Sequence, residues 1–157
     1  MTHATEGSND EKRCFEDIEV GCELTSDGYT IEREEIIEFA RRWDPYDFHL
    51  DEGAARDSLF GGIAACAAHV FAISSFLSHA LPGGPLALVA GLGGDGLNLL
   101  APVRPGARLR LVRRFIAARP SKSHPTAGVV TFEDTLVSTD GEALFRTTGS
   151  VLVERRD

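Results

Sequence analysis

Cysteine is scarce in this chain of 157 residues: there are only Cys14, Cys22 and Cys66, and no CxxC motif. An odd number of cysteines without that spacing argues against a disulfide framework or a zinc site and fits a reducing compartment. Residues 1–13 are polar and charged and lack the apolar core of a signal peptide. We therefore expect a cytoplasmic protein with a flexible tail at 1–13 and a single domain at 14–157.

No charged residue occurs between Ser58 and Gly94, a gap long enough to be tested as a membrane span. Its most apolar part, Leu59–Leu77, contains glycines, serines and a histidine, owes much of its apolar content to alanine, and has no flanking Trp/Tyr belt or Lys/Arg cluster. A helix that is buried on all sides by protein has the same composition. We therefore expect a buried helix and no contact with a membrane.

Acidic residues are missing from a second stretch, Gly96–Phe132. The formal net charge of the whole chain is −8, which argues against nucleic acid as a partner. A basic segment inside an acidic protein is typical either of a site for a small anion or of cations that protect the edge of a sheet. Its basic residues are Arg104, Arg108, Arg110, Arg113, Arg114, Arg119 and Lys122.

The order of elements predicts an α+β fold. A strand or hairpin arm at 23–31 precedes a helix that Thr30 can cap and that Asp44-Pro45 ends. A loop at 44–50, a helical turn at 51–58 and the long apolar helix follow, with Gly61-Gly62 before that helix and Pro82 after it. Strands are expected at 86–92, 97–100, 107–117, 128–138 and 143–154. A curved antiparallel sheet wrapped around the apolar helix explains why no face of that helix is polar.

Chemistry is concentrated in Trp43–Asp51, where three carboxylates surround His49 in a loop between helices. A histidine beside a carboxylate such as Asp44 can hold a water or exchange a proton near neutral pH. The alternative is a histidine that only caps a helix or fills a polar niche. A metal site at His49, Asp44 and Asp51 would have too few nitrogen ligands, so we expect neither a metal nor another cofactor.

The segment Asp44-Pro45-Tyr46-Asp47-Phe48-His49-Leu50-Asp51, followed by Phe60-Gly61-Gly62-Ile63-Ala64-Ala65-Cys66, resembles the hydratase motif of MaoC-like dehydratases. The chain is thus similar to (R)-specific enoyl-CoA hydratases, and the resemblance extends from about Phe15 to Arg155. In that motif an aspartate stands five residues before a histidine, and an acidic residue follows two positions later. The resemblance implies a hotdog fold and a lyase that hydrates a 2-enoyl thioester carried on CoA or on an acyl carrier.

The resemblance also implies roles for individual residues. Asp44 and His49 become the acid/base pair that holds water against the double bond. Gly61 and Gly62, at a helix N-terminus, would let the thioester oxygen approach backbone N–H groups, although two glycines also suit a tight turn. The other positions expected around the substrate are Tyr46, Phe60, Cys66 and His69.

Two segments depart from the family pattern. Tyr46 and Asp47 replace the usual Gln/Asn and Pro, which puts loop shape and substrate contacts in question. Cys66-Ala67-Ala68 stands where Ser-Gly-Trp is common, so part of the pocket should be wider. We expect Cys66 to be an inert buried thiol and His69 to be hydrogen-bonded in the core.

Coenzyme A gives the basic segment a candidate ligand, because arginine binds phosphate well. Arg104, Arg119 and Lys122 lie near turns and are the candidates for its phosphates. Two other functions stay open, a hotdog thioesterase and a non-catalytic acyl-binding protein, although Gly61–Ala80 lacks the helix carboxylate that many hotdog thioesterases use. A lone sheet of this kind leaves an edge and an apolar face exposed, so we expect a homodimer or a higher homo-oligomer.

Overall fold

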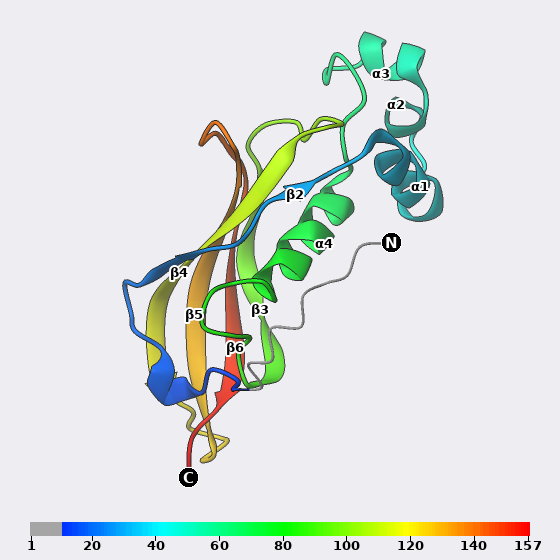
Figure 1. Ribbon diagram of the computed structural model, residues 1–157. Helices are drawn as coiled ribbons and strands as arrows, with labels where there is room; N and C mark the ends of the chain where they lie inside the picture. The colour runs from blue at the N-terminus through cyan, green and yellow to red at the C-terminus, as the bar shows by residue number, and fades with distance from the viewer. Residues whose placement is uncertain (1–10) are drawn as a thin grey trace.

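The computed structural model describes residues 11–157, and its central element is an antiparallel sheet of six strands. The long strands are β3 (Leu88–Leu99), β4 (Arg108–Pro120), β5 (Ala127–Ser138) and β6 (Ala143–Glu154). Two short strands, β1 (Glu23–Thr25) and β2 (Tyr29–Thr30), pair with β4, and the order is β1-β4-β5-β6-β3. The sheet curves around helix α4 (Ala67–Ser78), as Figure 1 shows, which confirms the predicted α+β architecture.

The strands follow the alternation of the sequence, because successive side chains point to opposite faces of a sheet. In β4 the buried positions are Leu109, Leu111, Arg113 and Phe115, and in β5 they include Phe132, Asp134 and Leu136. The two apolar runs at 86–92 and 97–100 prove to be parts of one strand, β3. The glycine-rich stretch between them shifts the register with β6 instead of ending the strand, as expected where glycine permits a bulge.

Helix α4 differs from its prediction at both its start and its exposed side. It begins at Ala67 and not after Gly62, because the Ala65 N–H donates to the Val103 carbonyl and holds that segment against another part of the chain. Val70, Ile73 and Leu77 face the core, but Phe71 and Phe76 on the other side are exposed. The helix is therefore apolar all round but covered on one side only within this chain.

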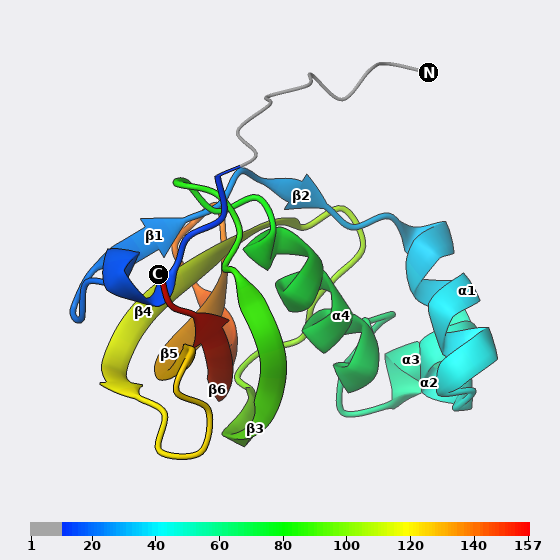
Figure 2. The same ribbon diagram turned by 90° about the horizontal axis from the view of Figure 1, so that it is seen from below.

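Three helices form a separate group at one end of the sheet, beyond the N-terminus of α4 (Figures 1 and 2). They are α1 (Arg33–Trp43), α2 (Asp47–Leu50) and α3 (Glu52–Asp57). The N-cap of α1 is Glu32 and not Thr30, which belongs to β2. The physical reason is that Ile31 exchanges backbone hydrogen bonds with Gly106 and Ala107, which keeps the chain extended through that position.

The opposite end of the sheet carries the first described residues. A 3-10 turn at Phe15–Asp17 packs the Phe15 ring onto Gly128 at the start of β5. Arg13, which the sequence placed in the tail, forms a bridge with Leu86, while positions 1–10 of that tail lie outside the described residues. Within 11–157 no helix has the length and hydropathy needed to cross a bilayer, and α4 itself has 12 residues.

Candidate active site

Asp44 stands where α1 ends. Pro45 disfavours helical geometry in the residue before it, so the chain leaves the helix there, although the Asp44 N–H still donates to the Ala40 carbonyl at 2.8 Å. The carboxylate side chain is 34% exposed. Among residues 11–157, no donor forms a hydrogen bond with it. Asp44 is thus held by its backbone while its side chain is free to accept protons or hydrogen bonds.

His49 belongs to the short helix α2 and is 5% exposed. Its Nδ1 lies 2.8 Å from the Ala64 carbonyl oxygen. A carbonyl can only accept, so Nδ1 must carry the proton and donate it. In the neutral ring the other nitrogen, Nε2, then has a free lone pair.

The free nitrogen of His49 faces the free carboxylate of Asp44. Nε2 and Oδ2 are 3.7 Å apart, too far for a good direct hydrogen bond but close enough for one small molecule to contact both. The structure therefore brings together the two residues that the sequence singled out. It also adds Ala64, whose carbonyl sets the tautomer of His49.

Aromatic rings surround His49. Phe48 meets the imidazole edge-on with ring centroids 4.6 Å apart, and Phe60 lies 5.9 Å away by the same measure. Tyr46 stacks on the far side of Phe48 and is 61% exposed, so it does not reach the imidazole directly. Phe60 thus lies beside His49, whereas Tyr46 lies at the outer surface of the aromatic group.

The turn at Gly61-Gly62 does not open a helix. Gly61 has φ +65°, a conformation that favours glycine, and Arg104 donates to the carbonyls of Phe60 and Gly62 on either side of it. The helix N-terminus that faces this region belongs instead to Cys66 and Ala67. Unpaired backbone N–H groups for a negative oxygen are therefore expected at the start of α4 and not at the two glycines.

Cys66 is the N-cap of α4 and is almost fully buried. Burial is the main effect and raises the pKa of its thiol. The backbone N–H of His69 lowers this pKa, whereas the nearby negative charge of Asp44 raises it. The protonated thiol is thereby favoured, as expected for an inert cysteine.

His69 belongs to a second polar group a short distance along the same helices. Its Nε2 lies 2.9 Å from Glu35 Oε1, and the Tyr29 hydroxyl donates to both Glu35 oxygens at 2.7 and 2.8 Å. The imidazole also stacks on Phe39 with ring centroids 4.3 Å apart. Sequence reasoning anticipated a hydrogen-bonded His69 but missed Glu35 and Tyr29. The spacing of Glu35 and Phe39, four residues apart on one helix face, was a usable signal.

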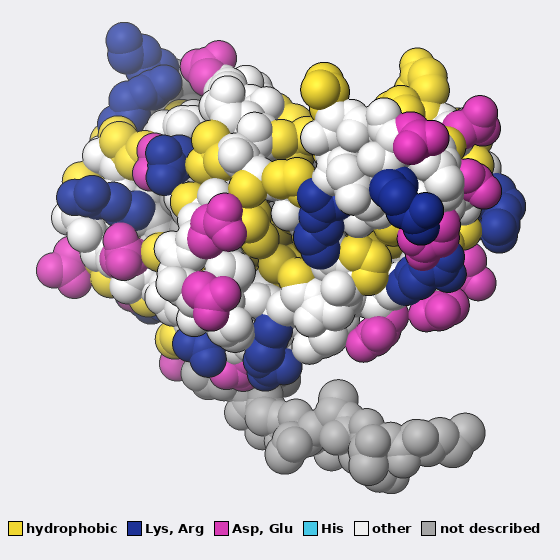
Figure 3. All heavy atoms as spheres, turned by 90° about the horizontal axis from the view of Figure 1, so that it is seen from above, with side chains coloured by type: hydrophobic (Ala, Val, Ile, Leu, Met, Phe, Trp, Pro, Cys, Tyr) yellow, Lys and Arg dark blue, Asp and Glu magenta, His cyan; other side chains and the backbone are white. Residues whose placement is uncertain are grey.

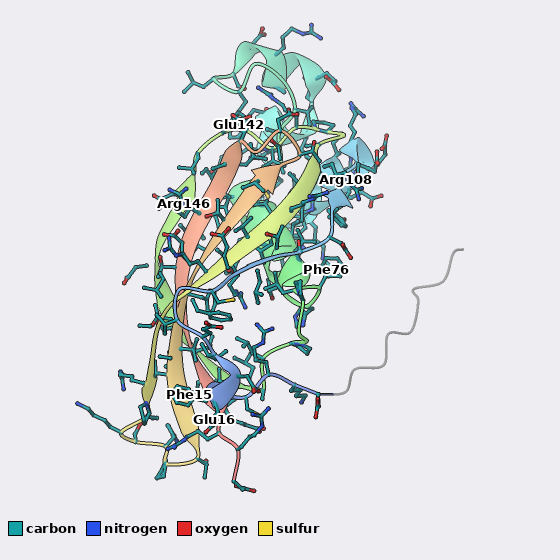
Figure 4. All side chains as sticks on the ribbon, turned by 60° about the vertical axis from the view of Figure 1, so that its left-hand side comes forward. Phe15, Glu16, Phe76, Arg108, Glu142 and Arg146 are labelled. Carbon is teal, nitrogen blue, oxygen red and sulfur yellow. The ribbon has the colours of Figure 1, made fainter. Side chains whose placement is uncertain are left out.

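The three basic candidates for CoA phosphates do not come together in one chain. Arg104 is occupied by the carbonyls around Gly61-Gly62. Arg119 is the last residue but one of β4, roughly 35 Å along the strand from Arg108 at the usual rise per residue. Figure 4 shows Arg108 near the three helices α1 to α3 and Phe15 at the opposite end of the sheet. Phe15 contacts Gly128, which pairs with Pro120, the residue after Arg119, so Arg119 also lies at that opposite end. Arg119 and Lys122 thus lie far from His49 of their own chain.

Known proteins similar to this chain identify its family. The family described as "MaoC like domain" matches residues 19–134, a segment that contains Asp44, His49 and all of α4. The chain belongs to the MaoC-like domain family. A MaoC-like dehydratase from Rhodospirillum rubrum is 38% identical to this MaoC-like protein, with TM-score 0.83, and the match covers 92% of this chain and 99% of the other. A comparison with curated proteins found no match.

More distant structures share the fold of this MaoC-like protein. An (R)-hydratase from Pseudomonas aeruginosa is 19% identical, with TM-score 0.72 and coverage of 91% of this chain and 86% of that one. A Mycobacterium tuberculosis protein described as having a double hotdog fold is 15% identical, with TM-score 0.75, and the match covers 92% of this chain and 45% of that one. The fold is the hotdog fold that the sequence resemblance implied.

Proposed function

We propose that this MaoC-like protein is a hydratase/dehydratase that adds water reversibly to a 2-enoyl thioester carried on CoA or on an acyl carrier, with Asp44 and His49 as its acid/base pair. The observation that supports the proposal most is the 3.7 Å gap between His49 Nε2 and Asp44 Oδ2. Both atoms accept hydrogen bonds when the imidazole is neutral and the carboxylate ionised, and neither is engaged by the other.

A water in this gap can donate one hydrogen to each acceptor, which leaves its oxygen lone pairs directed at the substrate. The oxygen bonds to C3 as one of its protons passes to the pair, and the pair returns a proton to C2. The net change is the addition of H and OH across the double bond. Elimination of water from the 3-hydroxyacyl thioester is the same path reversed.

Negative charge builds up on the thioester oxygen as C3 is attacked. We assign its stabilisation to the N-terminus of α4, where Ala67 is the first helical residue. Backbone N–H groups there are fixed in place before the reaction, and the helix dipole favours a negative charge. Arg104 supports this arrangement indirectly, because it fastens the segment that leads into the helix.

The proposal includes a second copy of the chain. β3 ends the sheet order and is exposed along most of its length, and it carries Leu88, Val89, Leu92, Leu97 and Leu99 on the surface. Figure 3 shows hydrophobic side chains exposed among the charged ones on one face of the molecule. An apolar edge strand of this length is suited to pairing with its own copy across a two-fold axis. In such a dimer the distant Arg119 and Lys122 would serve the partner's substrate.

Loss of the enoyl absorbance tests the proposal directly, with crotonyl-CoA and with longer and branched 2-enoyl-CoAs. We expect hydration to a 3-hydroxyacyl-CoA, with light scattering giving the mass of a dimer. A thiol reagent in a parallel assay reports free CoA. Release of CoA without loss of the double bond would assign the protein to the thioesterases. Tight acyl-CoA binding without either reaction would make it an acyl-binding protein.

A further inference from the structure

One cavity formed by the described residues lies between the C-terminal half of α4 and the sheet, outside the Asp44–His49 pair. Its volume is about 480 Å³. Phe71, Ser74 and Ser78 of α4 form one wall, and residues of β3, β5 and β6 form the other walls. A cavity of this size holds a small organic group.

A buried ion pair forms part of the floor of this cavity. Arg113 and Asp134 lie opposite each other in the register of β4 and β5, and their exposed fractions are 7% and 4%. Nε and Nη2 donate to the two carboxylate oxygens at 2.7 and 2.8 Å, and the guanidinium lies 3.7 Å from the Phe132 ring centroid. Burying two charges costs more than placing apolar side chains at the same positions, so stability alone does not explain this pair.

The pair leaves polar atoms available to a ligand. Arg113 uses two of its three nitrogens on Asp134, and no hydrogen bond from Nη1 is found within residues 11–157. Hydroxyl side chains line other walls, among them Ser74, Ser75 and Thr148. The two charges of the pair cancel, and the only other ionisable side chain on the lining is His79. An uncharged oxygen can hydrogen-bond the Arg113 Nη1 and the hydroxyls of the walls. A methyl group would leave these polar atoms without a partner, and a carboxylate would bury an unbalanced charge.

Helix α4 connects the cavity to the proposed reaction site. Ala67, Phe71, Ser74 and Ser78 follow one another at helical spacing and share a face. The rise per residue puts Ser74 about 10 Å from Ala67 along the axis. If the thioester carbonyl binds at Ala67, an acyl chain of medium length that follows this face is long enough to reach the cavity.

We infer that the Arg113–Asp134 cavity is the tail subsite of the proposed hydratase and selects acyl chains that carry an uncharged oxygen, such as a hydroxyl or carbonyl group, near their end. This inference rests on the proposed function and narrows its substrate class. The pair hydrogen-bonds the tail oxygen, and the serine and threonine hydroxyls complete its shell.

Matched substrates test the inference on the unaltered protein. Each pair of 2-enoyl-CoAs has the same number of heavy atoms, from about six to ten in the acyl chain, and ends in either a methyl or a hydroxyl group. We expect kcat/KM to favour the hydroxyl member by about tenfold or more at one length, as for sites that hydrogen-bond a substrate hydroxyl. Equal values at every length, or a preference for the methyl or for a terminal carboxylate, would overturn the inference.

Variants then tie the preference to the cavity. The double variant Arg113→Met/Asp134→Leu removes both charges without leaving one unpaired, and it should abolish or reverse the hydroxyl preference. Ser74→Ala is a milder change and should reduce the hydroxyl preference severalfold. It provides the test if the double variant does not fold. Thr135→Ala, next to Asp134 but paired with Arg146 on the other face of the sheet, is the control and should leave the ratio unaltered. An unchanged ratio in Ser74→Ala and the double variant would refute the role of the pair.

Failure of the proposed function is separable from failure of this inference. If no 2-enoyl-CoA is hydrated, calorimetry with saturated acyl-CoAs ending in methyl or hydroxyl still measures the selectivity of the cavity. Binding of the hydroxyl member about tenfold tighter supports the inference, and equal binding contradicts it.

Discussion

Helix α1 brings a carboxylate close to a histidine at each of its ends, and the two pairs differ in one respect. At its first turn Glu35 is hydrogen-bonded to His69 and to Tyr29, at distances of 2.7 to 2.9 Å. At its C-terminus Asp44 stands 3.7 Å from His49 with a gap between them. In the closed pair, Glu35 and His69, the carboxylate and the imidazole bond each other and hold two elements together, although His69 Nδ1 is buried without a partner among residues 11–157. In the open pair, Asp44 and His49, the facing groups stay available to a substrate.

The closed pair supports the open one through the backbone. Glu35 and Asp44 share α1, while His69 lies on α4, just after the segment whose Ala64 carbonyl holds His49. The separation of Asp44 from His49 therefore depends on how α1 docks against α4, and the Tyr29–Glu35–His69 group fixes that docking. We therefore expect changes at Asp44 and His49 to affect chiefly catalysis, and changes at Glu35 and His69 to affect chiefly stability.

The largest expected effect is on catalysis at the open pair. Asp44→Asn keeps the shape of the side chain but removes its ability to hold a proton. We expect kcat for enoyl-CoA hydration to fall by about 10²–10⁴-fold, the usual contribution of a general acid or base. The urea midpoint should stay close to the wild-type value, because the carboxylate has no hydrogen-bond partner within residues 11–157.

The matched change at the closed pair is Glu35→Gln, which should lower kcat by less than about tenfold. A variant Asp44→Asn that retains wild-type kcat, or a Glu35→Gln variant that loses as much activity as Asp44→Asn, would show that the open pair is not where the chemistry occurs.

The next effect is on stability at the closed pair. Glu35→Ala leaves the His69 Nε2–H and the Tyr29 hydroxyl without their acceptor, which should lower the free energy of unfolding by about 1–2 kcal/mol. Urea denaturation measures this change. Glu34→Ala, the neighbouring exposed residue on the same helix, is the control and should change stability by less than about 0.5 kcal/mol. Equal losses in the two variants would mean that the closed pair contributes nothing to docking.

The closeness of Asp44 and His49 could be predicted because the motif that carries the family resemblance is local. The spacing of Asp44 and His49 and the helix end at Pro45 are both contained in six residues. In β4, alternation puts Arg113 on the same face as Leu109 and Leu111. Its partner Asp134 lies 21 residues away on another strand, and the pairing follows only from the register.

What sequence reasoning missed depends on contacts between distant segments. The Ala64 carbonyl that holds His49 lies 15 residues from it, and Glu35 lies 34 residues from His69. The start of α4 was misplaced for the same reason: Gly61-Gly62 is a strong local signal, but the hydrogen bond from Ala65 to Val103 keeps the chain extended until Cys66. Local propensity gives the elements, whereas tertiary hydrogen bonds set their ends.

A smaller effect should be seen in the pH dependence of stability. Burial and the Glu35 carboxylate raise the pKa of Tyr29 from 10.0 to about 12. The folded state therefore favours the protonated phenol, and this stabilisation is complete below pH 10 and is lost as the pH rises to about 12. We expect the difference in unfolding free energy between wild type and Tyr29→Phe to shrink over that range. A difference that stays constant from pH 9 to pH 12 would place the phenol outside the closed pair.

The smallest effect is expected at Cys66, which borders both pairs through Asp44 and through the backbone N–H of His69. Burial excludes reagents and raises the pKa of the thiol, and alkylation requires the thiolate. Iodoacetamide at neutral pH should therefore modify the half-buried Cys14 and Cys22 before Cys66 and leave hydration activity intact, as peptide mass mapping and assay of the same sample would show. Labelling of Cys66 ahead of the other two would mean that the N-terminus of α4 opens to solvent between the two pairs. The closed pair would then fail to hold α1 against α4, and it could not support the open pair.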